Sequence, residues 1–213
     1  MAIKTFGHCR RLSSRAVATT SLPALFLAAA AVLAGQAPSP HGVDVQGVVR
    51  VGGKPTANAV VWLEAPNAPR TQSPPRVVLD QRNLNFSPRV LAVRVGTTVE
   101  FPNNDRVFHN VFSFIDGKRF DLGMYPVGTM RPVTFDRPGL SRIFCNIHPN
   151  MAAYVMAVDT PYFAVSDGSG AFNLRSVPPS RYKYHAWRSG AQELSGDWES
   201  GTNDAGLTVE WPA

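Results

Sequence analysis

The seven-residue stretch Cys145-Asn-Ile-His148-Pro-Asn-Met151 places a thiol, an imidazole and a thioether three positions apart. Side chains of these three kinds bind soft or borderline metal ions. Zinc rarely takes a thioether, whereas thiolate, imidazole and thioether together suit copper. The stretch therefore predicts three ligands of one copper ion.

A fourth ligand has to come from elsewhere, because a trigonal copper site with a weak axial methionine needs two histidines. His109 is the candidate, since it lies in an apolar run after a Gly-Thr-Thr turn and a Pro-Asn-Asn-Asp corner. We therefore expect His109, Cys145, His148 and Met151 to bind one type 1 copper ion. Taken singly, His109 is more typical of a buried strand residue and Cys145 of a buried apolar one.

The segments around these ligands resemble the cupredoxin family of blue copper proteins. Val95 to Asp105, His109-Asn110-Val111 and the Pro138-Gly139 turn precede the Cys-x-x-His-x-x-Met loop in the family's order, and the short loop is most similar to that of amicyanin. The resemblance covers roughly residues 76–159. It implies a cupredoxin domain with a Greek-key β-sandwich fold. It also implies that His148 reaches the surface, ringed by a docking patch that includes Met151.

The flanking segments resemble a second family, the carboxypeptidase-regulatory-like, transthyretin-type β-sandwich. Residues 45–51 and 59–64 read as two strands of a hairpin joined by a Gly-Gly-Lys-Pro turn, and residues 162–187 carry an Asp-Gly-x-Gly turn and a Val-Pro-Pro motif. We expect residues 42–66 and 161–213 to form one split sandwich into which the cupredoxin is inserted. The alternative is a cupredoxin with an extra hairpin and a separate C-terminal domain.

The composition predicts an all-β protein. The chain has 17 glycines and 18 prolines, and no stretch shows a sustained helical period. Proline-rich residues 66–75 read as a linker. His185, in Tyr184-His185-Ala186-Trp187, reads as a structural strand residue.

The first 37 residues read as a secretory signal peptide, with a basic start, an alanine-rich apolar run and a small-residue cleavage zone near Ala34 or Ala37. An uncleaved membrane anchor is the alternative. Cleavage would leave no transmembrane segment and an exported, periplasmic protein. It would also lower the net charge from +6 to about +2, and no arginine-aromatic stripe suggests nucleic-acid binding.

Cysteine and histidine counts limit the chemistry. Cleavage leaves Cys145 as the one cysteine, so it is a free thiol or a ligand and not half of an internal disulfide. The five histidines are too few for the further clusters of a multicopper oxidase. We therefore expect no enzyme. The resemblance to cupredoxins implies a one-electron carrier with a redox protein partner, such as a cytochrome or an oxidoreductase. The alternative is a periplasmic copper-binding or copper-delivery protein without redox turnover.

Overall fold

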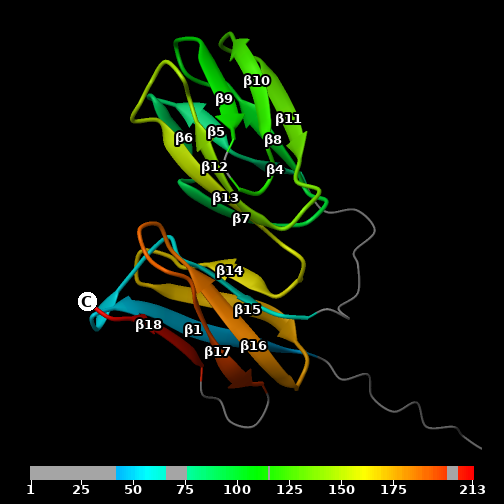
Figure 1. The fold of residues 1–213 in the computed structure, drawn as a ribbon, viewed down its shortest axis with the longest axis vertical. Coiled ribbons are helices and arrows are strands. Elements are labelled where there is room, and N and C mark those ends of the chain that lie inside the picture. Colours follow the sequence, from blue (N-terminus) through cyan, green and yellow to red (C-terminus); the bar gives the residue numbers. More distant parts are fainter. Residues whose placement is uncertain (1–41, 66–75, 115, 201–205) are drawn as a thin grey trace, which may run out of the picture. The chain divides into compact units, whose positions relative to one another are not determined.

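The computed structural model describes residues 42–65, 76–114, 116–200 and 206–213 (Figure 1). The predicted signal peptide at 1–37 and the predicted linker at 66–75 lie outside these residues. Within the described ranges every regular element is a strand, and the all-β prediction is confirmed. No described segment forms a helix with the length and apolar character needed to cross a membrane.

The strands from the middle of the sequence form a first sandwich of sheets around one buried apolar cluster. A five-stranded sheet has the order β10-β9-β12-β13-β7, a three-stranded sheet has the order β11-β8-β4, and β5 pairs with β6. The bounds are β4 (Val77–Val78), β5 (Asp80–Arg82), β6 (Asn85–Ser87), β7 (Val90–Arg94), β8 (Thr98–Pro102), β9 (His109–Ser113), β10 (Phe120–Tyr125), β11 (Met130–Thr134), β12 (Gly139–Phe144) and β13 (Ala152–Val158).

Alternation along these strands builds the core between the sheets, because successive side chains of a strand point to opposite faces. On β8, Val99 and Phe101 are buried and their neighbours are less so; on β12, Ser141 and Ile143 are buried while Arg142 is exposed. The buried faces form one apolar cluster, which includes Cys145 and Met151. The predicted ligand loop is therefore anchored in the core at both ends, by Cys145 and Met151, while residues between them are exposed.

The remaining strands form a second sandwich of two sheets, with the orders β15-β1-β18 and β14-β3-β16-β17, while β2 pairs with β1. The bounds are β1 (Val43–Val51), β2 (Lys54–Pro55), β3 (Val60–Leu63), β14 (Phe163–Val165), β15 (Ala171–Val177), β16 (Arg181–Trp187), β17 (Leu194–Glu199) and β18 (Leu207–Trp211). Each sheet thus combines a strand from before residue 66 with strands from after residue 160.

The predicted hairpin of residues 45–51 and 59–64 is wrong. Both segments are strands, but β1 pairs with β15 and β18, whereas β3 pairs with β14 and β16 in the other sheet. The physical reason lies in the burial of β3, where Val60 and Val61 are both fully buried. One face of β3 packs in the core shared with β1, and its other face packs in a separate cluster with β7, β13 and β16.

Candidate metal centre

Three of the four predicted ligands converge. His109 is the first residue of β9, Cys145 directly follows β12, and His148 lies in the loop before β13. The Nδ1 atoms of the two histidines lie 3.1 Å apart. Cys145 Sγ lies 3.9 Å from Nδ1 of His109 and 3.6 Å from Nδ1 of His148. Each residue thus turns one ligand atom toward the same point, and the group has the composition of a metal site.

The triangle of ligand atoms has the size that a metal ion requires. A circle through three atoms separated by 3.1, 3.6 and 3.9 Å has a radius of about 2.1 Å. Nitrogen and sulfur ligands stay about 2.0 to 2.3 Å from a borderline ion such as zinc. A single ion would therefore fit among these three ligand atoms.

A tight turn shapes the ligand loop. The N–H of Met151 donates to the carbonyl of His148 at 2.9 Å, and the N–H of Cys145 donates to the carbonyl of Met151 at 3.3 Å. Pro149 occupies the second position of the four-residue turn that the first bond closes, where its fixed φ is favourable. The loop therefore holds His148 beside Cys145 through backbone bonds that need no metal.

Asp105 orients His109, and the sequence analysis did not identify it. Its Oδ2 lies 2.9 Å from Nε2 of His109 and also accepts the N–H of Leu84, while its Oδ1 accepts the N–H of Arg106. Because a carboxylate only accepts, Nε2 carries the proton and the lone pair of Nδ1 faces the other ligands. The Pro-Asn-Asn-Asp corner, with Asp105 four residues before His109, is the signal that could have revealed this role.

The surroundings of Asp105 stabilise the ionised form of its carboxyl group. Burial acts to raise the pKa of this carboxyl, but the hydrogen bonds from Leu84, His109 and Arg106 outweigh burial and lower the pKa to about 2. Asp105 is therefore an anion under all ordinary conditions. A fixed anion behind an imidazole increases the basicity of the nitrogen that faces the metal.

Buried amides hold the corner that carries Asp105. The Nδ2 of Asn103 donates to the carbonyls of Val107 and Tyr125, and its Oδ1 accepts the N–H of Asp105. Gln81 donates to the hydroxyl of Tyr125, whose own proton goes to the carbonyl of Phe101. Burial raises the pKa of Tyr125, so this hydroxyl remains a donor. The corner is thus connected to β8 and β10 by side chains that reach no solvent.

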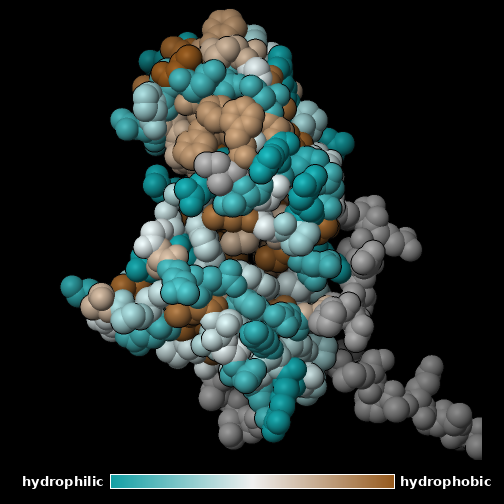
Figure 2. All heavy atoms as spheres, in the orientation of Figure 1, coloured by the Kyte–Doolittle hydropathy of each residue, from teal (hydrophilic) through white to brown (hydrophobic). Residues whose placement is uncertain are grey.

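Met151 lies deep in the same core cluster as Cys145, with 1% of its surface exposed. The expectation that it belongs to a surface patch around His148 is therefore wrong, because its backbone bond to Cys145 turns it inward. Other apolar side chains occupy that surface: Phe108 is 53% exposed and Ile147 is 50% exposed. Figure 2 shows tan and brown atoms gathered at the top of the view, where β9 begins and β10 ends in Figure 1.

The three ligands differ in solvent access. His109 and Cys145 are buried, whereas His148 is half-buried and is the one ligand of the three with an exposed edge. A thiolate and two imidazoles in a largely apolar enclosure suit copper, since soft sulfur and imidazole nitrogen both bind it well. His148 is the natural point of contact between such a site and the outside.

Comparison with known proteins gives structural matches only, since no family model and no curated protein matches this sequence. A purple cupredoxin from Nitrosopumilus maritimus is similar at 27% identity over 39% of this chain and 98% of its own, with a TM-score of 0.35. An amicyanin variant in the reduced state shows 25% identity over 46% of this chain and 99% of its own, with a TM-score of 0.35.

A copper-containing nitrite reductase from Thermus scotoductus SA-01 shows 28% identity over 46% of this chain, with a TM-score of 0.40. This chain spans about a quarter of that enzyme, 25% of its length.

Proposed function

We propose that this chain binds one copper ion through His109, Cys145 and His148, with Met151 as a weak axial ligand, and carries single electrons between proteins. The observation that carries the proposal is the triangle of ligand atoms, whose dimensions and donor types match a trigonal His₂Cys site. A copper ion bound there supplies a one-electron couple between Cu(I) and Cu(II). Zinc would account less well for a site that Met151 completes, because zinc rarely takes a thioether.

The protein's contribution is rigidity. His109 is held by Asp105, the ligand loop is closed by two backbone bonds, and Cys145 is packed in the core. Ligands held in this way keep their positions in both oxidation states, and small rearrangement favours rapid electron transfer. The buried thiolate is also shielded from water and from oxidants that attack exposed cysteines.

We further propose that the surface around His148 is where the redox partner docks, whether a cytochrome or an oxidoreductase. Val107, Phe108 and Ile147 are exposed apolar side chains from the two loops that deliver the ligands. Exposed apolar groups beside the one accessible ligand favour a brief contact, which excludes water between the two redox centres. We also propose that the protein works outside the cytoplasm, in the periplasm.

The visible spectrum tests the copper assignment. After one equivalent of Cu(II) is added, we expect an intense absorption band from the thiolate–copper bond, and we expect Cys145→Ser to abolish it. His185→Gln is the matched control and should keep the full band. Among the described residues, His185 is the one histidine that lies outside the proposed copper site. A wild-type spectrum without an intense band, or an unchanged band in Cys145→Ser, would refute the assignment.

Exchange kinetics separate a carrier from a copper-delivery protein. A carrier retains copper against a moderate chelator and exchanges electrons quickly with a small redox reagent in stopped-flow measurements. A delivery protein shows the opposite behaviour, with rapid metal loss and slow electron exchange. The second result would leave the metal ligands in place and replace the carrier role.

A further inference from the structure

One face of the sheet β14-β3-β16-β17 carries a cluster that the copper site does not use. Along β3, Val61 and Leu63 point into the core shared with β1, so Trp62 and the following Glu64 point to the opposite face. His185 is directly opposite Trp62 in the register of β3 and β16. The two rings stack, with centroids 5.1 Å apart and planes inclined by 11°.

Two carboxylates bind the stacked histidine, one at each nitrogen. Nε2 of His185 lies 2.6 Å from Oε1 of Glu64, and Nδ1 lies 2.8 Å from Oε1 of Glu193. A neutral imidazole has a single N–H and carboxylates only accept, so the two contacts require one additional proton on the ring or on a glutamate. In either arrangement the three side chains together carry one net negative charge.

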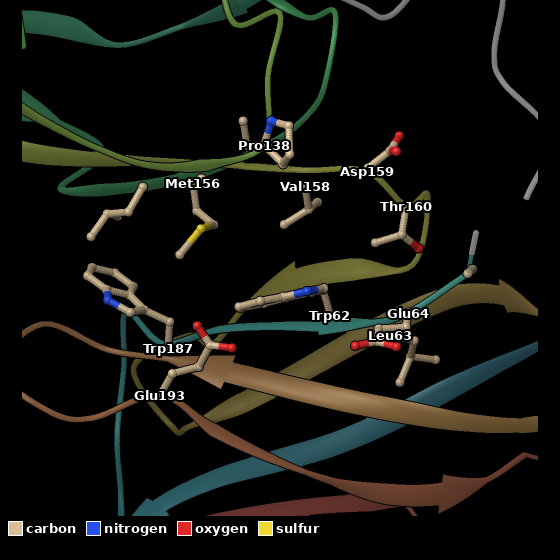
Figure 3. Close-up of a pocket in the computed structure, with 14 residues that line it drawn as sticks. Trp62, Leu63, Glu64, Pro138, Met156, Val158, Asp159, Thr160, Trp187 and Glu193 are labelled. Atoms are coloured by element: carbon tan, nitrogen blue, oxygen red, sulfur yellow. The ribbon is translucent and has the colours of Figure 1, made fainter. Parts of the chain in front are cut away.

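A cavity of about 460 Å³ lies over this cluster. Figure 3 shows Trp62 edge-on, with Glu193 near one end of the indole, Glu64 near the other, and Met156 and Val158 on the opposite side of the space. Trp187 forms a further wall. The described residues that line the cavity include three acids and two tryptophans but no lysine, arginine or histidine: Trp62, Leu63, Glu64, Ala65, Pro138, Gly139, Leu140, Met156, Ala157, Val158, Asp159, Thr160, Trp187 and Glu193.

This lining selects for one kind of ligand. The face of an indole attracts a cation, most strongly where water is excluded. The glutamates at the ends of Trp62 add negative potential, while Met156 and Val158 favour an apolar body. A metal ion is a poor fit, since both nitrogens of His185 are already hydrogen-bonded to glutamates and neither is free to bind a metal. Anions are repelled by the net negative charge.

We propose that this pocket binds a small organic cation, a quaternary ammonium or alkylammonium group that rests on Trp62 between Glu64 and Glu193. The site is built without any of the copper ligands. Its occupation is therefore independent of the metal, and the proposal stands or falls separately from electron transfer.

A charged probe and its uncharged isostere test the proposal. Choline and 3,3-dimethylbutan-1-ol have nearly the same shape and differ in the positive charge. We expect choline to bind the full chain at least tenfold more tightly, measured by calorimetry and by tryptophan fluorescence, with or without copper. Equal affinity for the two probes, or no heat and no fluorescence change with choline up to tens of millimolar, would overturn it.

Matched variants locate the binding. Glu193→Gln keeps an oxygen acceptor for His185 but removes one charge, and we expect the fold to tolerate this change because Glu193 is partly exposed. We expect about a tenfold loss of choline affinity. Glu199→Gln is the control, because Glu199 pairs with Arg181 on the same sheet and does not line the cavity. Equal affinity in both variants would show that choline binds elsewhere and would refute the assigned site.

Discussion

Each of the two sandwiches holds a histidine against a carboxylate, and the two arrangements have opposite consequences. His109 offers one nitrogen to Asp105 and turns the other toward Cys145 and His148. His185 has a carboxylate at both nitrogens. A nitrogen that is hydrogen-bonded to a carboxyl group is not free to bind a metal, so His109 keeps one ligand atom and His185 keeps none. The partner of the second nitrogen therefore decides whether a histidine is a metal ligand.

The two histidines also differ in how rigidly they are held and in how open their surroundings are. His109 is fully buried behind a corner that Asn103 ties to two backbone carbonyls. His185 stacks on Trp62 at the border of an open cavity, between glutamates that are about half exposed. Rigidity suits a site that holds an ion through changes of charge, whereas access suits a site for exchangeable molecules.

The largest expected effect comes from separating the two sandwiches. We propose that residues 42–66 and 161–213 form one folding domain, because β1 and β3 find their sheet partners among β14 to β18. Deletion of residues 161–213 should remove amide protection across residues 45–63 in hydrogen exchange and leave the copper band intact. Full protection of β1 and β3 in the shortened chain would contradict a split domain.

A single core substitution should destabilise one sandwich only. Leu174 is fully buried in the core of the second sandwich. Leu174→Ala should lower the free energy of unfolding by about 2 to 5 kcal/mol, through lost burial and the cavity left behind. Val43→Ala is the control on the same sheet, because Val43 is exposed, and it should change stability little. A weakened copper band in Leu174→Ala before unfolding would show that the sandwiches are not independent.

The contrast between the two histidines depends on Asp105. Asp105→Asn keeps an oxygen for the backbone donors but removes the charge that fixes and polarises His109. We expect copper affinity to fall about 10- to 100-fold, measured by competition with a chelator. Asp167→Asn is the control, since Asp167 also accepts backbone N–H bonds but lies in the second sandwich. Equal copper affinity in both variants would exclude Asp105 from the site.

The smallest effect concerns the axial ligand. Met151→Leu should retain copper and the visible band but raise the reduction potential, because the thioether donates charge to the oxidised ion. Voltammetry measures this shift. Met156→Leu is a matched control, as Met156 is buried in a different cluster. Identical potentials for wild type and Met151→Leu would mean that the axial position is empty or filled by another group.

Local spacing predicted the proximity of two ligands, because Cys145 and His148 are three residues apart in a short loop. His109 lies 36 residues from Cys145. It was predicted because a trigonal copper site needs a second histidine and because the segments around it resemble cupredoxins. Asp105 was missed because a corner aspartate normally serves only its own backbone, and here it serves both backbone and imidazole.

Long-range pairing could not be predicted in the same way. Alternating residues identify a strand but do not name its neighbours, so β1 and β3 were assigned to one hairpin although they belong to different sheets. The partners of His185 were hidden for the same reason, since Glu64 lies 121 residues away in the chain. The inward turn of Met151 follows from backbone bonds that spacing alone does not reveal.

The pairing of the first and last described strands has a mechanical consequence. β1 and β18 run parallel, with Gly47 opposite Leu207 and Val51 opposite Trp211. A pull on the two ends of the chain drags these strands in opposite directions along their own axes. The hydrogen bonds between the two strands are then loaded together in shear, so they must break together and not one after another. A pull on a tether at either end would therefore load the β1–β18 pair before any tension reached the proposed copper ligands.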